Sequence, residues 1–138
     1  MRVLALDYGA ARCGCAISDP TGVLARPLPV LEPPEPRAVA RLVEAHGVEL
    51  VVVGLPVGLS GEEGAQAEVV RRFRDDVAKL VDVPVETYDE RLTTRLAQRT
   101  ARSGASAAED SIAAAHLLES YLQARERQAG DHPASEEE

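Results

Sequence analysis

The sequence predicts a single α/β domain with a mixed central sheet of about five strands flanked by helices. Two observations predict this class. Apolar runs joined by tight-turn residues come first along the chain, and helices then alternate with strands. The chain has 138 residues, which suits one domain with one sizeable core.

Three strands are expected near the N-terminus. Residues 2–7 form an almost continuous apolar run, as in a central strand covered on both faces. Residues 12–18 alternate two cysteines and an isoleucine with smaller side chains, which is a strand pattern. Residues 23–31 follow a turn and contain two prolines, and prolines favour an edge strand because they cannot donate to a neighbour.

Helices and strands alternate through the rest of the chain. Helices are expected where apolar side chains recur at helical spacing, and strands where short apolar runs are bounded by glycine or proline. A proline at the first turn and a glycine at the end mark the first helix. The expected elements are helices over 36–46, about 69–80, 92–102 and 107–127, and strands over 48–53 and 83–88.

Acidic side chains follow the ends of predicted strands. Asp7 ends the first apolar strand, where a partly desolvated carboxylate is costly unless a cation or a hydrogen-bond donor meets it. Asp7 could instead simply begin the turn at Tyr8 and Gly9. The stretch 54–56 and the pair Asp89–Glu90 also end strands, and ligand sites of such sheets lie off these carboxyl ends. The coincidence favours a functional site.

A third acid comes from the last helix. Ser106 and Glu109 fit a capping box, which gives Glu109 a structural role. Helical phase then places Asp110 on the same side as Leu117 and Tyr121, on the apolar stripe that should pack on the sheet. An acid on that stripe needs a partner or a metal. Alternatively, the first turn overhangs the sheet and leaves Asp110 in water near the positive end of the helix dipole.

Asp89 and Glu90 precede a helix that carries a basic stripe. Asp89 is the better N-cap, so Glu90 is the preferred candidate for a metal ligand, although acids near a helix start are also favourable without any metal. The stripe suits contacts with a phosphate backbone, and a solvated helix face is the equally simple alternative. Its members are Arg91, Arg95, Arg99 and Arg102.

Net charge and composition restrict the choice of partner and compartment. The formal charge of −8 argues against a nucleic-acid partner. Half of it, however, lies in the last ten residues, which carry four acids and no Lys or Arg. Residues 128–138 are therefore predicted to be an acidic disordered tail that follows a domain over 1–127. Without an apolar span or leader, we expect a cytoplasmic protein, in which Cys13 and Cys15 are small core residues.

Five short motifs are weak singly and specific together. They are Leu6-Asp7-Tyr8-Gly9 with Arg12 and Gly14, Ser18-Asp19-Pro20, Val53-Gly54-Leu55-Pro56 with Gly61, Asp89-Glu90-Arg91-Leu92-Thr93-Thr94, and Asp110 followed by Ala113-Ala114. With them, the sequence up to about residue 127 resembles the YqgF/RuvX family of Holliday junction resolvases, within the RNase H-like superfamily. The resemblance implies an RNase H-like fold.

The resemblance also implies a function. Asp7, Glu90 and Asp110 would be catalytic ligands of Mg²⁺ or Mn²⁺ in an endonuclease that hydrolyses phosphodiester bonds by a two-metal mechanism. Arg12 and Arg91 would be candidates for holding phosphate. The substrate would be a Holliday junction or the 5′ end of pre-16S rRNA, and the protein a monomer or a homodimer. The family's members often carry Lys or Arg shortly before the last acid, whereas residues 103–109 have none. Contacts with the substrate would then depend on Arg12 and the basic stripe.

Two alternatives remain. The turn after the first strand also resembles the phosphate loop of actin-like ATPases and sugar kinases, but those enzymes need two such lobes and this chain has room for one. A non-catalytic RNA- or ribosome-binding module with the same fold is the other alternative. The three acids argue against this module, whereas the negative charge and the missing basic segment argue for weak activity.

Overall fold

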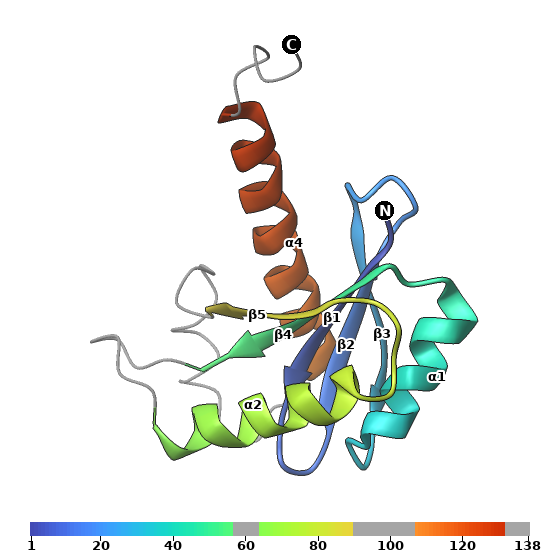
Figure 1. The fold of residues 1–138 in the computed structure, drawn as a ribbon, viewed down its shortest axis with the longest axis vertical. Coiled ribbons are helices and arrows are strands. Elements are labelled where there is room, and N and C mark those ends of the chain that lie inside the picture. Colours follow the sequence, from blue (N-terminus) through green and yellow to red (C-terminus); the bar gives the residue numbers. More distant parts are fainter. Residues whose placement is uncertain (57–63, 90–106, 132–138) are drawn as a thin grey trace.

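The computed structural model describes residues 1–56, 64–89 and 107–131. In this part of the chain, one five-stranded sheet has helices on both faces (Figure 1). The elements in chain order are β1 (Val3–Tyr8), β2 (Cys13–Ser18), β3 (Ala25–Leu31), α1 (Pro36–His46), β4 (Leu50–Leu55), α2 (Ala65–Ala78), β5 (Val85–Asp89) and α4 (Ala107–Asp131).

The sheet is mixed, as the sequence predicts. Its strand order is β3-β2-β1-β4-β5. Tight turns make β1, β2 and β3 antiparallel neighbours, whereas β1, β4 and β5 run parallel because helices connect them. The carboxyl ends of β1, β4 and β5 therefore lie along one edge of the sheet. We refer to this edge as the carboxyl edge.

Side chains of β1 alternate between two apolar layers. Leu4 and Leu6 belong to the apolar layer that α1 and α2 cover, while Val3 and Ala5 belong to the layer that α4 covers. Figure 1 shows these helices on the sheet. All four side chains are completely buried. This explains the continuous apolar run, because a strand covered on both faces has no polar side to present to solvent.

The edge strand and the two ends of α1 lie where the prolines and a glycine predict them. β3, which contains Pro27 and Pro29, is an edge strand. Pro36 opens α1, and Gly47 ends it in the left-handed conformation with φ of 64°. These three predictions are confirmed.

The two cysteines lie in the core. Cys13 and Cys15 are fully buried on the same face of β2 as Ile17. Contact with Cys15 and burial raise the pKa of the Cys13 thiol well above its usual value. A buried thiol with a raised pKa reacts poorly, which agrees with the predicted packing role.

Two predicted helices need comment. α4 continues to Asp131, so residues 128–131, which we expected in the disordered tail, are helical. Gln128 and Ala129 favour helix, and the restriction imposed by Pro133 on the residue before it comes only later in the chain. The predicted helix over 92–102 and the rest of the tail lie outside the described residues. Among the described residues, no helix is long and apolar enough to span a membrane.

The turn between β2 and β3 is organised by one carboxylate. Asp19 accepts hydrogen bonds from the hydroxyl of Thr21, from the backbone N–H of Val23 at 2.8 Å and from that of Leu24 at 2.9 Å. These donors favour the charged form and hold the pKa of Asp19 far below its ordinary value. The turn therefore keeps its shape although Val23 and Leu24 are exposed.

Asp19→Asn should lower stability in a pH-dependent way. Because the pKa of Asp19 is depressed in the folded state, its contribution is fully present above the unfolded pKa of about 4, begins to decline below it, and is lost as the pH falls through the depressed folded pKa. Urea unfolding at pH 7 should thus show a lower midpoint for the variant, and the gap to the wild type should narrow at pH 3.5. A gap that stays constant between these two pH values would exclude a role for the charge.

Candidate functional site

Asp7 lies on the face of the sheet that α4 covers. It continues the alternation of Val3 and Ala5 along β1, and it is half-buried. In the antiparallel register, Asp7 pairs with Gly14 of β2. The side chain therefore comes off the carboxyl edge of the sheet and faces the layer that contains α4.

Gly14 brings the start of α4 onto the sheet. A Cβ at Gly14 would come closer than 3.0 Å to the backbone carbonyl oxygen of Asp110, and backbone atoms cannot easily move aside. The backbone of α4 can approach β2 this closely only because residue 14 has no side chain. One turn of the helix is thereby placed beside the strand residue that pairs with Asp7.

A buried hydroxyl fixes the same turn of α4. The backbone N–H of Cys15 donates to Ser111 Oγ at 3.3 Å, and Ser111 is almost fully buried. Below it, the predicted apolar stripe packs on the sheet through Ala114, Leu117 and Leu118. The prediction that Asp110 heads the stripe that packs on the sheet is therefore confirmed.

Asp110 is paired with Arg12. Arg12 Nε donates to Asp110 Oδ2 at 2.5 Å, and the two side chains are 27% and 28% exposed. Arg12 lies in the short turn between β1 and β2, where its carbonyl accepts a hydrogen bond from Gly9 N–H at 3.0 Å. The bond to Asp110 raises the pKa of Arg12. The alternative in which Asp110 stands alone in water is thus excluded.

Of the two acids predicted at the end of the last strand, the structure describes Asp89 but not Glu90. Asp89 is the last residue of β5 and pairs with Leu55 of β4, so β5 ends at the carboxyl edge. Along β5, Tyr88 packs into the α4 layer, and the alternation directs Asp89 to the opposite face. Glu90, Gly61 and the whole basic stripe (Arg91, Arg95, Arg99 and Arg102) lie outside the described residues.

The two described carboxylates suit a hard divalent cation. Asp7 and Asp110 come from different elements, and both are neighbours of Gly14 at the carboxyl edge: Asp7 is its partner in the β1–β2 register, and the backbone carbonyl of Asp110 approaches it from α4. Carboxylate oxygens are the ligands that Mg²⁺ and Mn²⁺ prefer. In the part of the chain that the structure describes, no cluster of three or more such acids, histidines or cysteines is present. A complete ligand set would therefore need a further residue.

A network that the sequence did not reveal joins β5 to α4. The Tyr88 hydroxyl lies 2.9 Å from Ser120 Oγ, and the Tyr121 hydroxyl donates to Glu86 Oε1 at 2.8 Å. The rings of Tyr88 and Tyr121 meet edge to face with centroids 5.4 Å apart. These contacts fix the end of β5 relative to the helix that carries Asp110. Only 3% of the residues are aromatic, so the tyrosines at 88 and 121 are the sequence signal that could have suggested these contacts.

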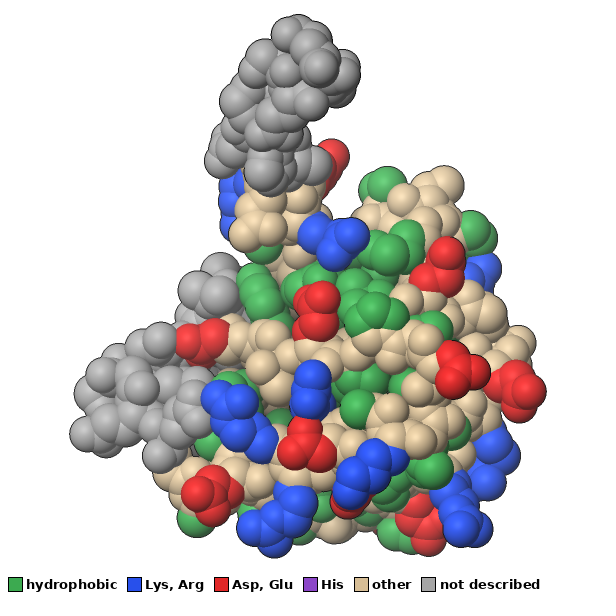
Figure 2. Space-filling model, in the orientation of Figure 1, with side chains coloured by type: hydrophobic (Ala, Val, Ile, Leu, Met, Phe, Trp, Pro, Cys, Tyr) green, Lys and Arg blue, Asp and Glu red, His purple; other side chains and the backbone are tan. Residues whose placement is uncertain are grey.

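The described surface has no basic groove on the face that Figure 2 shows. Lys and Arg side chains are interspersed with Asp and Glu over α2 and β5 (Figure 2). One such pair is Arg74 with Asp75, at 2.8 Å. This face therefore offers no continuous positive surface for a phosphate backbone.

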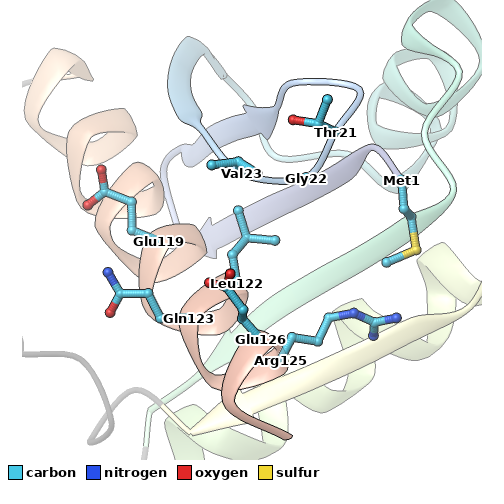
Figure 3. Close-up of a pocket in the computed structure, with 9 residues that line it drawn as sticks. All are labelled: Met1, Thr21, Gly22, Val23, Glu119, Leu122, Gln123, Arg125 and Glu126. Atoms are coloured by element: carbon cyan, nitrogen blue, oxygen red, sulfur yellow. The ribbon is translucent and has the colours of Figure 1, made fainter. Parts of the chain in front are cut away.

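A cavity of about 460 Å³ lies at the opposite end of α4 (Figure 3). It lies between the β2–β3 turn, the chain start and the second half of the helix, and none of the predicted site residues lines it. This cavity is thus separate from the acids at the carboxyl edge. Its lining residues are Met1, Thr21, Gly22, Val23, Glu119, Leu122, Gln123, Arg125 and Glu126.

Known proteins resemble this chain over most of its length. The family model RuvX, described as Holliday junction resolvase, matches residues 1–124. A relative from Chloroflexus aurantiacus named "Putative pre-16S rRNA nuclease" is 46% identical over 134 residues, which cover 89% of this chain and 87% of the relative. A relative of the same name from Desulforudis audaxviator is 40% identical and covers 91% and 96%.

A solved structure confirms the fold. RuvC from T. thermophilus in complex with a Holliday junction substrate superposes with a TM-score of 0.60 at 19% identity, covering 91% of this chain and 96% of that one. At this identity the likeness concerns the fold alone. The RNase H-like fold implied by the motifs is therefore confirmed, with its mixed five-stranded sheet between helices.

Proposed function

Because the chain belongs to the RuvX family of Holliday junction resolvases, we propose that it is a metal-dependent endonuclease that hydrolyses phosphodiester bonds in structured nucleic acid. One observation carries the proposal. Asp7 of β1 and Asp110 of α4 are both placed next to Gly14, at the edge where sheets of this kind bind ligands. A non-catalytic module would have no need for two acids beside the same residue at this edge.

The two acids would hold the cation and set its position. Asp7 is fixed by the β1–β2 pairing, and Asp110 by the docking of α4 through Ser111. Mg²⁺ or Mn²⁺ bound there would lower the pKa of an attacking water and stabilise the leaving oxygen. The protein's own contribution is a rigid placement of the carboxylates, so that little reorganisation is needed when the phosphate arrives.

Glu90 is proposed as the third ligand. The alternation along β5 directs Asp89 away from the α4 layer, on whose side Asp7 lies, so Asp89 is poorly placed to share a cation with Asp7 and Asp110. Glu90 is therefore preferred over Asp89. The arginines at 91, 95, 99 and 102 follow directly and are proposed to contact the phosphate backbone, which positions a substrate without reading its sequence.

Two substrates have specific support. The relatives that are 46% and 40% identical carry the pre-16S rRNA nuclease name, which favours 5′ maturation of ribosomal RNA. The family description favours a four-way DNA junction. Symmetric cutting of a junction would also call for a homodimer. Both substrates are consistent with the expected cytoplasmic location.

One assay separates these substrates. The purified protein with Mn²⁺ is incubated with an end-labelled pre-16S rRNA leader, a four-way DNA junction and a plain duplex of each kind. We expect cleavage of one structured substrate and little cleavage of the duplexes. EDTA should abolish the cleavage. If no substrate is cut with Mn²⁺ or Mg²⁺, the nuclease proposal is wrong and the binding-module alternative is favoured.

A further inference from the structure

We propose that Arg12 is a displaceable counterion of Asp110, which a divalent cation must release before Asp110 can act as a ligand. The inference rests on the proposed metal site. In this order of events, the guanidinium of Arg12 first neutralises Asp110. The cation then replaces the guanidinium, and Arg12 becomes available to a phosphate group.

The ion pair occupies one of the two carboxylate oxygens that a metal would use. Arg12 Nε lies 2.5 Å from Asp110 Oδ2, and a cation on this carboxylate would lie close to the positive guanidinium, so the two compete for Asp110. Arginine does not lose its proton in proteins, and contact with Asp110 raises its pKa further. The positive charge can therefore leave Asp110 only if the Arg12 side chain moves.

The surroundings allow such a movement. The Arg12 backbone is held in the β1–β2 turn by the bond from Gly9 N–H at 3.0 Å, while 27% of its side chain is exposed. A long side chain on a fixed backbone can rotate toward solvent without disturbing the sheet. Asp110 is held by the helix and cannot follow, because Gly14 and Ser111 fix that turn.

Electrostatics explains why a counterion is useful. Asp110 is a partly buried carboxylate, and a charge in such a place is costly unless a partner neutralises it. Arg12 provides this partner in the metal-free protein. Once displaced, its planar fork suits a phosphate oxygen pair at the same edge.

Metal affinity of the Arg12→Gln variant tests the competition. Free Mn²⁺ is counted by electron paramagnetic resonance during titration of the wild type and the variant. If Arg12 competes with the cation, the variant should bind Mn²⁺ about tenfold more tightly, as expected for loss of a charge-assisted bond. Unchanged or weaker binding by the variant, or no binding by the wild type, would overturn the inference.

Arg127→Gln is the matched control for the lost charge. Arg127 is an exposed arginine on the same helix, about 25 Å along its axis from Asp110. Its replacement changes the net charge equally but leaves the ion pair intact, so Mn²⁺ affinity should stay within about twofold of the wild type. An increase as large as that of Arg12→Gln would show that net charge, and not the pair, governs affinity, and would overturn the inference.

A measurement on the unmodified protein does not depend on any variant folding. In ¹⁵N-labelled protein, the Arg12 Nε–H resonance should shift when Mg²⁺ is added, because its bond to Asp110 breaks. The Nε–H of Arg74, which donates to the Val85 carbonyl at 3.0 Å, provides the internal reference and should not shift. An Arg12 resonance that stays in place while Mg²⁺ binds would contradict displacement.

These outcomes are separable from the failure of the nuclease proposal. Tighter Mn²⁺ binding by Arg12→Gln without cleavage of any substrate would support the counterion and reject the nuclease. Cleavage by the wild type together with unchanged Mn²⁺ affinity in Arg12→Gln would support the nuclease and reject the counterion.

Discussion

Asp7→Asn is expected to reduce metal-dependent cleavage by about a thousandfold, since a loss of ~4 kcal/mol of transition-state stabilisation corresponds to that factor. Asparagine keeps the shape of the side chain but loses the charge that would hold the cation. Because Asp7 is only half-buried, the free energy of unfolding should change by less than about 1 kcal/mol. Single-turnover cleavage and urea unfolding measure the two quantities.

Asp76→Asn is the control for Asp7→Asn. Asp76 is an exposed acid on α2, and its nearest described cation is Lys79 at 3.8 Å. Loss of this negative charge should leave cleavage within about twofold of the wild type, as isolated surface pairs contribute little. If Asp7→Asn cuts as fast as Asp76→Asn, then Asp7 is not a metal ligand and merely begins the turn after β1.

Gly14→Ala should cost about 3 kcal/mol of stability or more. The new Cβ would lie closer than 3.0 Å to the Asp110 carbonyl oxygen, so α4 would have to move away from β2. Overpacking of this kind typically costs 1–3 kcal/mol, and here both contact partners include backbone. The displaced helix would carry Asp110 away from Asp7. Mn²⁺ affinity should therefore fall even in conditions where the variant remains folded.

Gly64→Ala is the matched substitution for Gly14→Ala. Nothing lies within 4 Å of a Cβ at Gly64, and its φ of −105° is open to alanine. We expect a stability change within about 1 kcal/mol and unchanged Mn²⁺ affinity. Chemical denaturation of both variants compares the two glycines. Equal stability of the two variants would mean that α4 does not pack against Gly14 as described.

Local patterns in the sequence were sufficient to predict most of the fold. The apolar run before Asp7 and the two prolines in β3 each report on burial or hydrogen bonding at their own position, so one chain suffices to interpret them. Helical phase likewise predicted the side of α4 on which Asp110 lies, because the period of a helix is fixed.

The partner of Asp110 could not be predicted in this way. Arg12 and Asp110 are 98 residues apart in the sequence, so no local sequence pattern contains both residues. We expected Arg12 to hold phosphate, and nothing in a turn arginine predicts which acid it meets. The close approach at Gly14 had a visible signal, since a glycine inside a strand often marks a neighbouring backbone. That signal does not say which backbone approaches.

The position of α4 at the end of the described chain has a consequence for biosynthesis. The ribosome makes every strand of the sheet before it makes the helix that supplies Asp110, and one face of the sheet depends on that helix for its apolar cover. Asp7 and Asp110 are therefore not placed on either side of Gly14 in a nascent chain until α4 has emerged and docked.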